Sequence, residues 1–252
     1  MTGVSLASGS GGNAYLVESQ GALLLIDCGL GYRELKKRAA DAGFGLERLL
    51  GVLFTHEHID HTKGVGAFRK HHPDVPLFAN DMTAEAIGGA FTIFENGQAF
   101  ALGPFEVSAF SIPHDVCDPV GYRICADGKT YFHATDVGSP LDSIGVNLAC
   151  ADAATLESNH DPVLVRQSDR PEQLKRRILG PRGHLSNDQA ADLVRRFAAP
   201  RLKYLALAHL SEKCNAPHLA RRAMEEALAE AGRTDVTLAV LEQCRPGEVW
   251  RC

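Results

Sequence analysis

Short apolar blocks follow one another along the chain. Some have the continuous or alternating pattern of a β strand, and others have apolar residues at the spacing of an α helix. Short continuous or alternating apolar runs predict β strands. Such runs occupy residues 14–17, 22–26, 49–54, 75–79, 105–110, 120–125, 131–134, 153–156, 203–208 and 236–241. Helices are predicted at residues 32–42, 63–71, 83–87, 187–197 and 217–230. Strands and helices in two similar halves predict a layered α/β sandwich.

The composition fits one domain that covers residues 1–252. Hydrophobic residues make up 45% of the 252 positions, which is enough to bury a single large core. No apolar stretch reaches the roughly 20 residues that a membrane-spanning helix needs, and the N-terminus lacks the basic and apolar segments of a signal peptide. The seven cysteines form no CxxC pair. This pattern is typical of a reducing compartment and predicts a cytoplasmic protein.

A cluster of histidines directly follows the apolar run at residues 49–54. Residues 55–61 read THEHIDH, so three imidazoles and an aspartate stand together on the loop after a predicted strand. Neutral imidazoles and carboxylates are suitable ligands for zinc, iron or manganese. Further candidates lie at or after β segments downstream, at His114, Asp136 and His209. The alternative for the cluster is a solvated histidine-rich turn.

Five histidines and two aspartates exceed what one ion needs and suit two ions. We assign His56, His58 and His114 to the first metal, Asp60, His61 and His209 to the second, and Asp136 to a bridge between them. Two ions roughly 3.5–4 Å apart would share a hydroxide and lower its pKa toward neutrality. Asp60 would orient that hydroxide. The choice between zinc and manganese stays open.

These residues resemble a metallo-β-lactamase-fold hydrolase. The likeness rests on Ile26-Asp27-Cys28-Gly29, the histidine cluster, His114, Asp136 and His209, in that order along most of the chain. It implies an α/β fold, a four-layer αββα sandwich with a dinuclear site at one edge of two facing sheets. It also implies that Asp27 braces the histidine loop. A plain turn aspartate is the alternative for Asp27.

Three further segments bear on the substrate. The Gly/Ser-rich loop at residues 8–13 exposes groups that could hold an anionic oxygen, although an ordinary flexible turn is the alternative. A polar burst at 156–161 and the segment 180–187 each contain a histidine, His160 and His184, and Ser186 is expected to cap the next helix. Surface or capping histidines are the alternative. The predicted substrate contacts are Ser10, Asn13, His160, His184 and Ser186.

A basic interval precedes His184 and suits phosphate. Its members are Arg166, Arg170, Lys175, Arg176, Arg177 and Arg182. The alternative is a solvated helix face balanced by neighbouring acids. The net charge of −5 argues against a surface that coats nucleic acid everywhere, but it leaves room for such a local patch.

Together these segments resemble the nucleic-acid-processing branch of the superfamily, and most of all the compact YycJ-type proteins, which are similar to ribonuclease J without its inserted clamp domain. The resemblance implies a dinuclear phosphodiesterase with 5′→3′ exonuclease action on DNA ends. It also implies that His184 contacts the scissile phosphate or protonates the leaving group, and that His209 is a metal ligand. Gly12 stands where we expect serine.

Several alternatives to this function remain. An RNA-processing nuclease, or an ester, thioester or lactam hydrolase, would fit the same metal ligands. A non-catalytic binding protein is a further possibility. The oligomeric state stays open.

Overall fold

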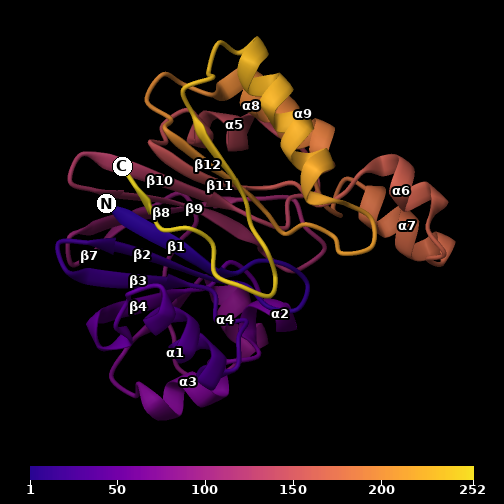
Figure 1. Cartoon of the computed structure of the whole chain (residues 1–252). Helices are drawn as coiled ribbons and strands as arrows, with labels where there is room; N and C mark the ends of the chain where they lie inside the picture. The colour runs from indigo at the N-terminus through magenta and orange to yellow at the C-terminus, as the bar shows by residue number, and fades with distance from the viewer. The chain divides into compact units, whose positions relative to one another are not determined.

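The computed structural model describes all of residues 1–252, which form two compact units (Figure 1). The first unit comprises Met1–Ser111, Val116–Lys129 and Glu242–Cys252. The second comprises Ile112–Asp115 and Thr130–Leu241. Each unit has its own strands and helices. A single domain over residues 1–252 stays a prediction.

A seven-stranded sheet forms the centre of the first unit, in the order β14-β1-β2-β3-β4-β5-β6. The strands are β1 (Thr2–Ala7), β2 (Ala14–Ser19), β3 (Ala22–Ile26), β4 (Leu49–Leu53), β5 (Leu77–Ala79), β6 (Thr92–Ile93) and β14 (Trp250–Arg251). Pairs β1–β2 and β2–β3 are antiparallel, whereas β3, β4, β5 and β6 run parallel. The C-terminal ends of β3 and β4 therefore lie side by side, and the segments that follow them are neighbours.

The helices of the first unit are α1 (Tyr32–Asp41), α2 (Ile59–Thr62), α3 (Val65–His71) and α4 (Asp81–Ile87), with a 3₁₀ turn at Leu46–Arg48. Leu35 of α1 and Phe68 of α3 are buried with strand residues such as Leu25 and Val52 in one hydrophobic core. Strands β7 (Ala99–Leu102), β8 (Phe105–Ser111) and β9 (Val120–Ala126) form an antiparallel meander. The continuous apolar sequence of β3 and β4 suits parallel strands that are covered on both faces.

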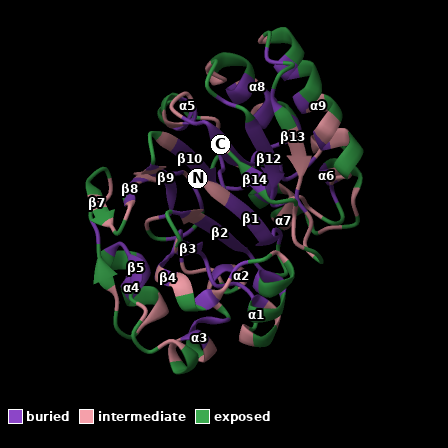
Figure 2. Cartoon of the chain, turned by 60° about the vertical axis from the view of Figure 1, so that its left-hand side comes forward, coloured by how far each residue is buried: buried purple, intermediate pink, exposed green.

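A parallel sheet forms the second unit, in the order β10-β11-β12-β13. Its strands are β10 (Lys129–Ala134), β11 (Ala153–Glu157), β12 (Tyr204–Ala208) and β13 (Thr237–Val240). Its helices are α5 (Asp142–Leu148), α6 (Pro162–Gln167), α7 (Glu172–Leu179), α8 (Asn187–Phe197) and α9 (Pro217–Glu230). Helices α8 and α9 pack side by side (Figure 1). Their outer faces are exposed, whereas β12 is buried (Figure 2). The neighbouring strand β11 is buried as well.

Every strand and helix predicted from the sequence overlaps an observed element of the same type. The helix predicted at residues 63–71 corresponds to α3, which begins only at Val65. A separate short helix, α2, covers Ile59–Thr62. The sequence patterns missed β1, β6, β7, β14, α2, α5, α6 and α7. None of the helices combines the length and the apolar character needed to cross a membrane.

Candidate metal and catalytic residues

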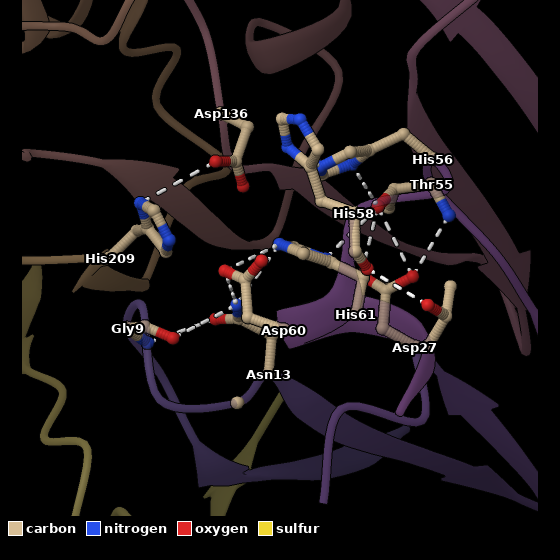
Figure 3. A network of polar contacts seen from close by, with 12 residues as sticks. Gly9, Asn13, Asp27, Thr55, His56, His58, Asp60, His61, Asp136 and His209 are labelled. Carbon is tan, nitrogen blue, oxygen red and sulfur yellow. Dashed lines mark hydrogen bonds and ion pairs between the residues drawn. The ribbon is translucent and has the colours of Figure 1, made fainter. Parts of the chain in front are cut away.

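Asp27 anchors the histidine loop of the first unit. It directly follows β3, and its fully buried carboxylate accepts hydrogen bonds from the Thr55 backbone N–H at 2.9 Å and from the Thr55 hydroxyl at 2.9 Å (Figure 3). Nδ1 of His61 lies 2.7 Å from the same carboxylate. Because Nδ1–H donates to Asp27, Nε2 of His61 keeps a lone pair for a metal ion. The expected bracing role of Asp27 matches these contacts.

The other imidazoles of the loop are held in a similar way. Nδ1 of buried His56 lies 3.0 Å from the Thr55 hydroxyl oxygen, which leaves Nε2 as the ligand atom. Nε2 of His56 lies 3.1 Å from Nδ1 of His58 (Figure 3). Two ligand nitrogens around a tetrahedral zinc ion are separated by roughly 3.3 Å. The donor set and the spacing of His56 and His58 therefore fit a divalent metal ion.

Three candidate residues of the second unit follow adjacent parallel strands. Asp136 follows β10, Glu157 ends β11 and His209 follows β12. Since the strands are parallel, their C-terminal ends meet at one sheet edge, where ligands bind in α/β folds. Ligand atoms of Asp136, Glu157, His184 and His209 lie within 4.8 Å of one another.

Glu157 is a site residue that sequence reasoning missed. It is fully buried, and its carboxylate accepts the backbone N–H groups of Asp136, Val137 and Leu185 at 3.1, 2.8 and 2.9 Å. The same carboxylate lies 2.9 Å from Nδ1 of His184 and 3.1 Å from Nδ1 of His209. A carboxylate as the last residue of an otherwise apolar strand was the available signal.

Glu157 and His184 shift each other's pKa. Burial alone raises the pKa of Glu157, but the charge of His184 and the hydrogen bonds from both imidazoles outweigh it and hold that pKa below its ordinary value. Burial likewise lowers the pKa of His184, but the charge and hydrogen bond of Glu157 outweigh it and raise that pKa. The pair thus favours a charged carboxylate and a protonated imidazole.

His114 has the surroundings of a neutral imidazole. Its Nδ1 lies 3.0 Å from the Gly183 carbonyl oxygen, so Nδ1–H donates there and Nε2 carries the lone pair. Burial lowers the pKa of His114, although the Asp136 carboxylate acts in the opposite direction. The segment that carries His184 therefore also orients His114.

Comparison with known families identifies the fold. Residues 23–206 match the family model described as "Beta-lactamase superfamily domain". The chain belongs to the metallo-β-lactamase superfamily. The solved metallo-β-lactamase-fold protein YhfI from Bacillus subtilis superposes with a TM-score of 0.73 at 20% identity, over 100% of both chains. These findings confirm the predicted αββα fold class.

Two relatives are more similar in sequence. Exodeoxyribonuclease WalJ of Streptococcus pneumoniae serotype 2 (strain D39 / NCTC 7466) is 35% identical over 90% of this chain and 87% of its own length. Exodeoxyribonuclease YycJ of Bacillus anthracis is 34% identical over 90% of this chain and 89% of its own length. The resemblance to the YycJ-type branch is thereby confirmed, and this member of the superfamily is a metal-dependent hydrolase.

The predicted substrate contacts lie in different surroundings. Ser10 is exposed on its loop, whereas Asn13 is buried and its side chain bonds both N–H and C=O of Gly9. The Asn13 amide nitrogen also lies 3.3 Å from Asp60 and 3.0 Å from Nε2 of His61 (Figure 3). Asn13 therefore joins the Gly/Ser loop to two candidate ligands.

Ser186 and His160 are both buried in the second unit. The Ser186 hydroxyl accepts the Gln189 backbone N–H at 3.2 Å and closes a capping box on α8. Burial lowers the pKa of His160 to about 4. The cap on α8 is confirmed, and substrate contact by either residue stays a prediction.

The absence of serine at position 12 has a steric reason. Gly12 has φ +153°, and a Cβ there would lie 2.3 Å from the Gly29 carbonyl oxygen. A serine would force the loop away from the segment that follows Asp27. Glycine is therefore required by the close approach of two backbones.

Proposed function

We propose that this protein is a dinuclear-metal phosphodiesterase that digests DNA in the 5′→3′ direction. Its similarity to two proteins named exodeoxyribonucleases supports a metal-dependent nuclease. The proposed ligands of two divalent ions, zinc or manganese, are His56, His58, Asp60, His61, His114, Asp136 and His209. Bound ions would activate the attacking nucleophile and neutralise charge on the phosphoryl oxygens.

The contact between Glu157 and His184 carries the proposal. A nucleotide leaves as an alkoxide, which is a poor leaving group unless it receives a proton. The buried Glu157 carboxylate, 2.9 Å from Nδ1, favours the protonated form of His184. His184 can therefore donate a proton to the leaving oxygen or stabilise charge on the phosphate.

The same contact bears on the rival substrates. A thiolate leaves a thioester without needing a proton, because thiols ionise near pH 8.5. A protonated imidazole is therefore of greater use against a phosphodiester than against a thioester. Parallel assays of DNA, RNA, a thioester and a β-lactam separate the proposed activity from an RNA-processing nuclease and from the other hydrolases.

Substitution of His184 and His209 tests the proposed roles. His184→Ala should keep two ions per chain and the folded state, yet lose roughly 10²–10⁴-fold in the rate of DNA cleavage. His209→Ala should lose metal. Metal content is measured after loading with excess manganese or zinc, beside the cleavage rate.

A substrate with a better leaving group provides the control. Bis(4-nitrophenyl) phosphate releases a nitrophenolate that departs without a proton, so His184→Ala should cleave it at close to the wild-type rate. DNA cleavage by His184→Ala at the wild-type rate would contradict the role of His184. A wild-type protein that never binds more than one ion would contradict the dinuclear assignment.

A further inference from the structure

The loop at residues 8–13 is fixed by side chains from distant parts of the first unit. The Gln243 side chain accepts the Gly11 N–H at 2.6 Å and donates to the Gly12 carbonyl at 3.0 Å. The Gly12 N–H donates to the Gly9 carbonyl at 3.0 Å, and Asn13 holds Gly9 from the other side. The loop is therefore a rigid element with most of its polar groups in use.

Lys63 is the one cation placed on this loop. Its ammonium group donates to the Gly11 carbonyl oxygen, and a Cβ at Gly12 would lie 3.2 Å from that ammonium. The Lys63 side chain is exposed and forms no ion pair. A carbonyl oxygen carries no full charge, so the positive charge of Lys63 remains uncompensated. An ammonium has three N–H donors, and Gly11 takes one of them.

The surroundings of Lys63 suit an anion. Ser10 and Gly11 are exposed beside it, and Ser10 makes no hydrogen bond within the protein through its hydroxyl or its N–H. Lys63 stands two positions after His61, and the loop it contacts reaches Asp60 and His61 through Asn13. The loop that carries Ser10 and contacts Lys63 is thus joined through Asn13 to two candidate metal ligands of the same unit.

We propose that Lys63 and Ser10 form a subsite for a non-scissile phosphodiester of the nucleic-acid chain, with Gln243 as the positioning residue that holds the loop. The inference rests on the proposed nuclease function. Glycine at position 12 contributes to this subsite, because it lets the loop approach both Gly29 and Lys63.

Lys63→Met tests the subsite. Loss of one charged hydrogen bond should raise KM for single-stranded DNA about tenfold and lower the slope of log affinity against log salt by about 0.7. Lys63→Arg should restore both values. The rate on bis(4-nitrophenyl) phosphate, which has no neighbouring phosphate, should stay at the wild-type level. Gln243→Ala should raise KM for DNA with little change in salt slope.

Lys70→Met is the matched control, since Lys70 is an exposed lysine of α3 and forms no ion pair. It should leave KM and slope unchanged. Wild-type KM and slope in Lys63→Met would overturn the subsite while leaving the nuclease function intact. Equal loss on both substrates together with a lower melting temperature, unrescued by arginine, would also overturn it. A wild-type protein that neither binds nor cleaves nucleic acid would refute the function as well.

Discussion

At the scale of the residue, three side chains beside the candidate site sit on left-handed backbone. Asp27 and Asp136 have φ 58° and His209 has φ 56°. Such conformations cost on the order of 1–3 kcal/mol for residues other than glycine. Hydrogen bonds offset this cost, from Thr55 to Asp27 and from the Asp136 N–H to Glu157. The left-handed backbone at these strand ends thus lowers stability but fixes the direction of a few side chains.

Local sequence revealed some of these residues and not others. The histidine loop was recognisable because its donors are contiguous. Glu157 was not assigned a role, because its partners His184 and His209 are 27 and 52 positions away. The sequence predicted only that Lys63 begins a helix. Its contact with Gly11 could not be predicted, because the two residues are 52 positions apart. A sequence pattern cannot show contacts that only strand pairing creates.

Buried His160 predicts a pH-dependent stability. Burial lowers its pKa in the folded protein from 6.5 to about 4. Between these values the unfolded chain binds a proton that the folded chain does not, so the free energy of unfolding falls as pH decreases from 6.5 to 4. His160→Gln should remove on the order of 2 kcal/mol of this fall.

Urea unfolding at several pH values in that range measures the effect. Between pH 6.5 and pH 4 the free energy of unfolding should fall more steeply with decreasing pH in the wild type than in His160→Gln. Parallel stability curves for the two proteins would show that His160 is protonated equally in both states.

At the scale of the element, strand ends bring candidate residues together within each unit. The apolar runs of β3, β4, β10, β11 and β12 were predicted because they are continuous and buried. Helices α6 and α7 were not predicted, because each is short and lacks a long apolar face. A small core of Val165, Ile178 and Cys214 stabilises them. Tertiary contacts therefore decide these helices.

The α7 helix predicts a difference between two neighbouring arginines. Arg177 is paired with Asp115, whereas Arg176 is exposed and forms no ion pair. In a His184→Ala background that slows digestion roughly 10²–10⁴-fold, Arg176→Gln should lower the slope of log DNA affinity against log salt by about 0.7–0.9. Arg177→Gln should lower it less, because its charge is already compensated.

Fluorescence anisotropy over a range of salt concentrations gives these slopes. Arg222→Gln is the control, since Arg222 is an exposed arginine of α9 that lies 3.9 Å from Glu226. If the three variants have the same slope, the basic interval does not contact DNA and is a solvated helix face.

At the scale of the whole molecule, the family could be predicted from the order of a few motifs along the chain. The match over residues 23–206 and the relatives at 34% and 35% identity confirm that prediction. The net charge of −5 argues against uniform attraction to nucleic acid. The proposed affinity for DNA would then come from local groups such as Lys63 and the basic interval. The direction of digestion depends on the orientation in which the DNA binds, and no sequence motif gives that orientation.

The most direct test is a time course of manganese-supported digestion of one single-stranded DNA, labelled at either end. The account predicts that the 5′ label is released first as a mononucleotide, while the 3′-labelled strand shortens progressively. Early release of the 3′ label, internal cuts alone, or no digestion at all would contradict it.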